Sequence, residues 1–171
     1  MFYNIYIIKM SEFTFFWREN NKNGFLSQWY YSPFQDDENI IYNCSEQYMM
    51  YYKAKLFNDD LIASRILNTT LPYEQKKLGK QVKNFNQKIW DEQCESIVLT
   101  ANLLKFSQNP KLKEMLLNTK DTILVEASPY DNIWGIGLYE SDKRAHDPKK
   151  WLGKNKLGKI LIDVRNILKK N

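Results

Sequence analysis

The sequence contains very little cysteine and histidine. Its 171 residues include two cysteines, Cys44 and Cys94, and one histidine, His146. These residues form neither a CxxC nor an HExxH motif, which argues against a structural zinc site or a disulfide framework. We therefore expect no metal site. A thiol nucleophile paired with His146 is the chemical alternative, but a packed or solvated side chain explains each of these residues more simply.

Long hydrophobic runs are missing as well. Residues 2–8 are apolar, but about seven residues are too few to cross a bilayer. The stretch also lacks the basic leader and the small-residue cleavage site of a signal peptide. We expect it to form a first strand, and we expect a cytoplasmic protein without a membrane partner.

Proline and glycine are scarce, with five and six residues, which excludes a collagen-like or low-complexity chain. Apolar residues make up 43% of the chain, enough for a core, and the length fits a single domain over residues 1–171. The net charge is +5, and no run of five basic residues occurs. This charge suits an anionic ligand such as a nucleotide, and would help an encounter with nucleic acid without requiring one.

Local patterns predict an α+β fold in which helices dominate. Short aromatic or β-branched runs predict strands at 13–17, 40–42 and 122–127, with loop and strand within 131–137. Helices are predicted from apolar stripes at helical spacing, from N-cap residues, and from prolines at helix starts and glycines after helix ends. They are expected at 46–57, after Asp60, from Leu71 to Gly79, at 86–106, from Pro110 and at 157–169. This order differs from the alternation of a doubly wound sheet.

Two charged residues share one face of the first predicted helix. Ser45 is a good N-cap, and positions 46 and 53 then lie two turns apart, roughly 10 Å along the axis. Both side chains are long enough to converge on one small molecule, so Glu46 and Lys53 would suit acid catalysis and nucleophilic attack at a sugar carbon. An amphipathic helix with two ordinary surface charges explains the same spacing.

The same segment belongs to a longer pattern. Residues 44–55, Cys-Ser-Glu-Gln-Tyr-Met-Met-Tyr-Tyr-Lys-Ala-Lys, resemble S-[AC]-E-Q-Y-M-M-x-x-K-A, a signature of the NADAR (YbiA-like) family. Further similar segments follow in order: GFLSQWY at 24–30, SPF at 32–34, KLG at 77–79, Val82, Trp90, KFSQN at 105–109, LVEASPYDNIWGIGL at 124–138, WLGKNKLG at 151–158 and DVR at 163–165. The ordered set is highly specific and covers about residues 13–169. Trp17 and Arg18 depart from the pattern, which continues there in a more glycine-like way.

The resemblance implies a predominantly helical α+β fold and an N-glycosidase-type hydrolase that cleaves between an amino nitrogen and ribose C1. Two substrate classes are implied: ADP-ribose attached to guanine in nucleic acid, which the basic charge favours, and phosphorylated ribosylamine intermediates of early riboflavin synthesis. Water is the co-substrate, no cofactor is implied, and protein partners are unknown. A binding module for ADP-ribose or NAD is the competing role, although binding alone would not need both Glu46 and Lys53.

The resemblance also implies catalytic roles. Glu46 is expected as general acid or base, Lys53 as nucleophile or electrostatic clamp, and Asp131 as the group that orients the ribose. Burial beside aromatic residues would raise the pKa of Glu46 and suit it to acid work. Glu126, on the strand before Asp131, is expected either as a second acid or as the partner of a buried arginine.

A second set of residues is expected to bind the substrate: Trp29, Trp90, Glu126, Trp134, Gly135 and Asn155. The tryptophans offer stacking surfaces for a base, although Trp90 suits a core position nearly as well. Gly135 permits close approach of the backbone to a ligand. Asn155 lies in a loop whose N–H groups suit a phosphate, and a simple helix-entry loop explains it about as well.

Overall fold

A computed structural model describes residues 13–170 and confirms a mostly helical α+β fold. The helices are α1 (Ser45–Leu56), α2 (Asp60–Leu67), α3 (Pro72–Gly79), α4 (Gln87–Gln108), α5 (Pro110–Leu117) and α6 (Lys156–Lys170). The strands are β1 (Phe13–Phe16), β2 (Phe34–Gln35), β3 (Ile41–Tyr42) and β4 (Ile123–Glu126). Three short 3₁₀ turns complete the described elements: η1 (Gly24–Leu26), η2 (Lys143–His146) and η3 (Pro148–Lys150).

The strands form two small sheets. β1 pairs with β4 in parallel, with Phe16 opposite Glu126, and β2 pairs with β3 in the antiparallel sense. The strand predicted within 131–137 is wrong, because this segment consists of turns and bends closed by a bond from the Gly137 N–H to the Asp131 carbonyl. The strand predicted at 2–8 lies outside the described residues.

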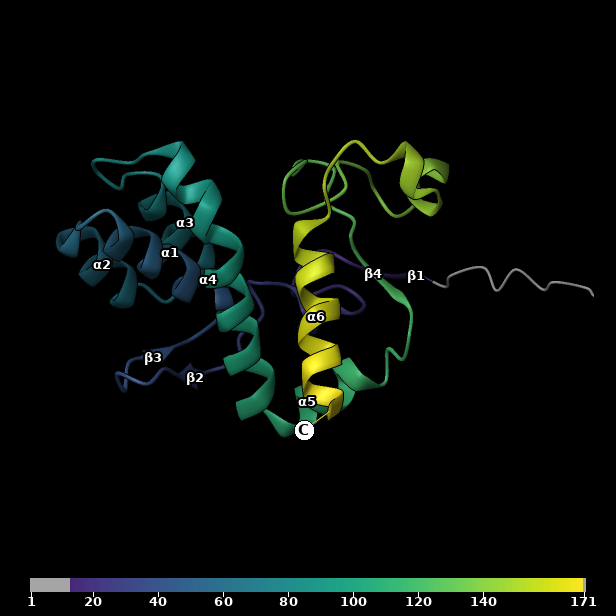
Figure 1. Cartoon of the computed structure of the whole chain (residues 1–171), viewed down its shortest axis with the longest axis horizontal. Coiled ribbons are helices and arrows are strands. Elements are labelled where there is room, and N and C mark those ends of the chain that lie inside the picture. The colour runs from purple at the N-terminus through teal and green to yellow at the C-terminus, as the bar shows by residue number, and fades with distance from the viewer. Residues whose placement is uncertain (1–12, 171) are drawn as a thin grey trace, which may run out of the picture.

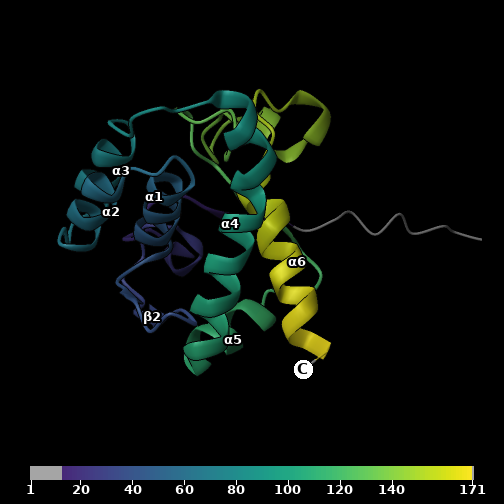
Figure 2. The same ribbon diagram turned by 60° about the vertical axis from the view of Figure 1, so that its left-hand side comes forward.

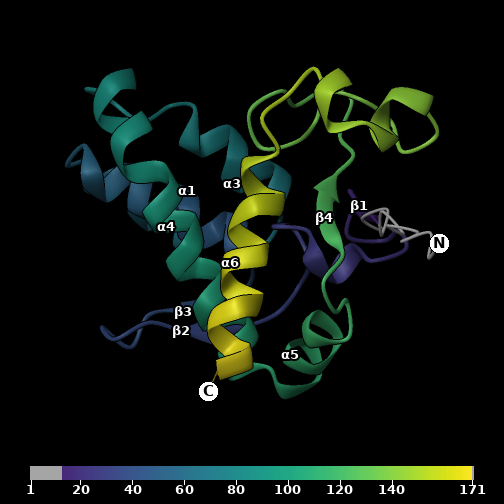
Figure 3. The same ribbon diagram turned by 45° about the vertical axis from the view of Figure 1, so that its right-hand side comes forward.

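Helix α1 lies at the centre of one half of the molecule. It packs against α2, α3 and α4, while α6 packs against α4, α5 and β4 (Figures 1 and 3). Figure 2 shows α4 and α6 lying side by side along much of their length. Every residue of α1 from Ser45 to Tyr51 is buried. The first two turns of the helix are therefore buried on all sides, and Glu46 is the charged residue that they bring into the interior.

The predicted N-cap of α1 is wrong. Cys44 occupies the cap position without a side-chain hydrogen bond, and Ser45 is the first helical residue. Its hydroxyl instead donates to Oδ1 of Asn102 on α4 over 3.5 Å. The Glu46 N–H, left free at the helix start, donates to the Gln28 carbonyl over 3.0 Å. A tertiary contact therefore replaces the side-chain cap and places the 27–30 segment beside Glu46.

A buried lysine holds the start of this segment. Lys105 on α4 is fully buried, and its Nζ donates to the carbonyls of Phe25 and Ser27 over 2.7 and 2.9 Å. Burial lowers the pKa of Lys105 to about 7. This residue therefore anchors the backbone that leads to Gln28 and Trp29.

The buried amine predicts a pH dependence of stability. In the unfolded chain Lys105 keeps its proton up to its ordinary pKa of 10.5, whereas the native residue releases it near pH 7. The unfolded state then binds more protons between these values, so this residue's contribution to stability rises with pH. From pH 7 to 9 the wild type should gain about 2 kcal/mol relative to Lys105→Met in urea unfolding. Parallel curves for the two proteins would contradict this expectation.

Candidate active site

Glu46 lies in the first turn of α1 and is only 5% exposed. Burial raises the pKa of this carboxyl group, while the charge of Lys76, a hydrogen bond from the Trp29 indole and the charge of Lys53 oppose the rise. The balance is a raised pKa, as the sequence predicted from burial beside aromatic residues. Glu46 is thus a buried acid whose charged form nearby cations support.

Glu126 ends β4 and is a second, partly buried acid. Its Oε2 atom is enclosed and has no hydrogen-bond partner among the described residues. Burial raises the pKa of Glu126 to about 8, and the charges of Asp131 and Glu46 add to the rise. Glu126 therefore carries a proton at neutral pH. An enclosed carboxyl group with an unpartnered oxygen is ready to bond to a group that enters from outside.

Asp131 lies beside both glutamates. Its Oδ1 atom accepts bonds from the N–H groups of Ile133 and Trp134, over 2.9 and 2.8 Å. Its charge raises the pKa of Glu46 and of Glu126, so the three carboxyl groups lie within electrostatic range of one another. One oxygen of Asp131 thus shapes the turn, and the other accepts no hydrogen bond from residues 13–170. We call Glu46, Glu126 and Asp131 the carboxyl cluster.

Lys53 lies two turns along α1 from Glu46. Its Nζ is 4.3 Å from the Phe85 ring centroid and 5.4 Å from that of Trp90. Burial lowers the pKa of this half-buried lysine, the charge of Glu46 opposes the change, and the charge of Lys80 adds to it. A lowered pKa increases the share of neutral amine, which a nucleophilic role requires.

Lys76 on α3 is a further residue of this site, and the sequence reasoning missed it. Its charge is the strongest of those that favour ionised Glu46, it acts in the same sense on Glu126, and its Nζ is 5.9 Å from the Trp29 ring centroid. Lys76 and Lys80 are four residues apart on or next to α3, so they share a helix face. The spacing of Lys76 and Lys80 is visible in the sequence. The packing of α3 on α1, which brings Lys76 close to Glu46, is not.

The three predicted tryptophans lie in different settings. Trp29 is half-buried and contacts both Glu46 and Lys76. Trp90 is 9% exposed within the main core, where its ring supports Lys53. Trp134 is half-buried, packs on the main core and belongs to the Asp131 turn. Of the three, Trp29 is the one whose indole lowers the pKa of Glu46.

Gly135 and Asn155 position the backbone around Glu126. A Cβ at Gly135 would lie 2.9 Å from the carbonyl oxygens of Asp131 and Glu126, too close for any other residue. The buried Asn155 side chain accepts from the Glu126 N–H over 3.0 Å and donates to the Leu124 carbonyl over 2.9 Å. Its amide is therefore occupied by β4, and Asn155 acts on the site through the placement of Glu126.

Two hollows, of about 410 and 720 Å³, lie near the β1–β4 sheet, and neither is lined by Glu46 or Lys53. A single cavity that both side chains enter therefore stays a prediction. Among residues 13–170, no group of three or more His, Cys, Asp or Glu side chains is arranged to hold a metal ion. None of the helices within that range is long and apolar enough to cross a membrane.

Comparison with known proteins gives one consistent family. The model of the NADAR domain matches residues 15–169. An N-glycosidase of Acanthamoeba polyphaga mimivirus is 41% identical over 165 residues, which are 92% of this chain and 97% of that protein. A riboflavin biosynthesis protein of Vibrio vulnificus is 26% identical over 95% of this chain but only 40% of its own length. The solution structure of Escherichia coli YbiA has the same fold, with a TM-score of 0.76 at 24% identity over 98% of this chain and 90% of that one.

Proposed function

This chain belongs to the NADAR domain family, and from that premise we propose that it hydrolyses the bond between an amino nitrogen and ribose C1, removing ADP-ribose from guanine in nucleic acid. The observation that carries the proposal is the carboxyl cluster flanked by Lys53 and Lys76. Two acids with raised pKa values suit the proton transfers, and the cations suit the phosphates of ADP-ribose.

The electrostatics suggest how the two glutamates divide the work. Glu126 carries a proton at neutral pH and would donate it to the leaving nitrogen. Glu46 has Lys76, Lys53 and the Trp29 N–H nearby, so its ionised form is better supported, and it would take a proton from water. The water hydroxyl bonds to C1 as the C1–N bond breaks, and Asp131 would accept a hydrogen bond from a ribose hydroxyl. Two carboxyl groups with different charged neighbours can divide the acid and base roles between them.

Two roles are open to Lys53, and one role is proposed for Lys76. Lys53 with its lowered pKa would either attack C1, to form an imine with the opened sugar, or hold the ligand by its charge. The exposed Lys76 would act on the phosphates. Neither role needs a metal or a redox cofactor, and the cytoplasmic location stays a prediction.

A second substrate class has its own support, because one relative is a riboflavin biosynthesis protein. This chain spans less than half of that protein. The alternative substrate is a ribosylaminopyrimidine phosphate, which presents the same C1–N bond and one phosphate group.

A direct comparison of hydrolysis rates distinguishes the two proposed substrates. Purified protein should release ADP-ribose from an ADP-ribosylated guanine oligonucleotide, measured by chromatography, faster than it hydrolyses a ribosylaminopyrimidine phosphate. Activity on the pyrimidine alone would replace the proposal with the metabolic role. Tight binding of ADP-ribose without turnover of either compound would indicate a binding module.

The protonated glutamate predicts a pH profile. Because the Glu126 proton is lost as the pH rises through about 8, turnover should fall above that value. Glu126→Gln should be slow at all pH values, and its rate should no longer fall at alkaline pH. If the rate of the variant, measured from pH 6 to 10, still fell above a pH of about 8, the titration would belong to another group.

A further inference from the structure

Three aromatic side chains gather just beyond the ends of β1 and β4. The ring centroid of Trp17 lies 6.0 Å from that of Tyr130 and 5.7 Å from that of Tyr139. The hydroxyl groups of the two tyrosines are 2.9 Å apart. Tyr130 is 79% exposed and Tyr139 46% exposed, so the rings brace one another without being covered. We call these three residues the aromatic platform.

The platform borders a hollow large enough for a nucleotide base and sugar. Its volume is about 720 Å³, and Trp17 and Tyr139 line it together with Lys22, His146 and Glu140, among others. Clustered aromatic rings beside such a hollow leave apolar area that a bound ligand would cover.

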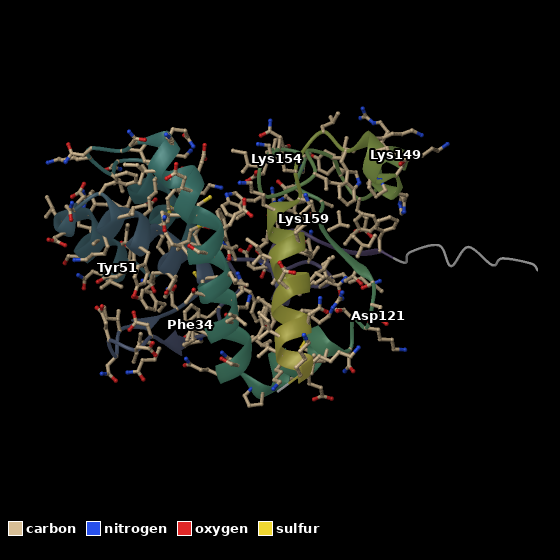
Figure 4. All side chains as sticks on the ribbon, viewed as in Figure 1. Phe34, Tyr51, Asp121, Lys149, Lys154 and Lys159 are labelled. Carbon is tan, nitrogen blue, oxygen red and sulfur yellow. The ribbon has the colours of Figure 1, made fainter. Side chains whose placement is uncertain are left out.

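The charge around the platform is mainly positive. The Arg18 guanidinium carbon lies 4.6 Å from the Trp17 ring centroid, and Lys22 is exposed beside the hollow. Glu140 is the acidic residue on the same rim. Figure 4 shows Lys149 and Lys154 at this end of the molecule, on the side away from Tyr51. Cations interleaved with stacking aromatics are typical of surfaces that bind single-stranded nucleic acid.

The platform and two members of the carboxyl cluster are carried by neighbouring residues of the chain. Phe16, which precedes Trp17, is paired with Glu126, and Tyr130 directly precedes Asp131. The backbone that carries the platform therefore continues directly into the backbone that carries Glu126 and Asp131.

We propose that Trp17, Tyr130 and Tyr139 stack on unpaired bases that flank the modified guanine, which makes the preferred substrate a single-stranded polynucleotide. The assignment of the hydrolysed group rests on the proposed function, whereas the binding surface stands on the geometry described above. Arg18 and Lys22 would contact the phosphates between these bases.

Binding of unmodified oligonucleotides tests the platform without any hydrolysis. Fluorescence anisotropy should show that Tyr130→Ala and Trp17→Ala bind a single-stranded 12-mer roughly 5- to 100-fold more weakly than wild type, the usual effect of losing one stacked base. Trp17→Phe should recover much of the affinity. Tyr31→Ala, which removes an aromatic side chain that is 73% exposed elsewhere, should bind like wild type. A duplex of the same sequence should bind more weakly, and DNA and RNA strands assayed in parallel identify the natural polymer.

Equal affinity of all four variants and wild type would overturn the platform, as would tighter binding of the duplex. Hydrolysis assays distinguish failure of the aromatic platform from failure of the proposed function. If both hold, Tyr130→Ala should cleave an ADP-ribosylated guanosine at the wild-type rate but lose kcat/KM on the oligonucleotide. If the wild type cleaves neither, the proposed reaction is wrong, while the binding data still decide the platform.

Discussion

Glu46→Gln should bind ADP-ribose as wild type does but turn over the guanine adduct more slowly by roughly 10²–10⁴, the scale of a lost acid–base group. Glutamine keeps the size of the side chain and can still accept the Trp29 hydrogen bond, but it cannot take a proton from water. Single-turnover rates and the Kd for ADP-ribose, measured on the same preparation, separate the two effects.

The matched control for this variant is Glu114→Gln, which changes an exposed carboxylate on α5. It should leave both the rate and the affinity unchanged. Glu46→Gln with a rate within about threefold of wild type would remove Glu46 from the chemistry. A loss of affinity equal to the loss of rate would assign it to ligand binding instead.

Lys53→Ala should be the second severe variant. If Lys53 attacks C1, borohydride added during turnover should trap a covalent adduct between protein and sugar, visible by mass spectrometry, and the alanine variant should give none. If Lys53 acts by charge, no adduct forms and Lys53→Arg should keep part of the rate, because arginine retains the charge but forms no imine.

Lys55→Ala is the control, because Lys55 lies on the same helix but pairs with Asp60 at the surface. It should keep the wild-type rate. An adduct that persists in Lys53→Ala would place the nucleophile elsewhere. Full activity of Lys53→Ala would show that its position near Glu46 is incidental.

Local signals predicted much of the fold. The six helices begin and end within a few residues of the predicted positions, because Pro72 and Pro110 lie at helix starts and apolar stripes mark the buried faces. The side chain of Asp59 caps α2 by accepting from the Ile62 N–H. The pairing of β1 with β4 was beyond such signals, since more than 100 residues separate Thr14 from its neighbour Thr122.

The errors have physical causes too. The Ser45 cap failed because the Gln28 carbonyl, distant in sequence, accepts the Glu46 N–H. The strand within 131–137 failed because Asp131 turns the backbone with its own side chain. Both cases show a tertiary contact or a local turn prevailing over propensity.

The sequence predicted that Glu46 and Lys53 share one face of a helix and reach one ligand. In the structure the charge of each residue acts on the pKa of the other, whereas their convergence on one ligand stays a prediction. The importance of Lys76 depends on how α3 packs on α1, and the elevated pKa of Glu126 depends on its enclosure at the end of β4. Neither arrangement has a signature in local sequence.

Product analysis tests the central claim that this chain cleaves the C1–N bond of an ADP-ribosylated base. After incubation with a guanine-modified oligonucleotide, mass spectrometry should find the unmodified oligonucleotide and intact ADP-ribose with wild type, and starting material alone with Glu46→Gln. An oligonucleotide that keeps a phosphoribosyl group, together with free AMP, would show cleavage of the diphosphate instead and would contradict the proposed reaction.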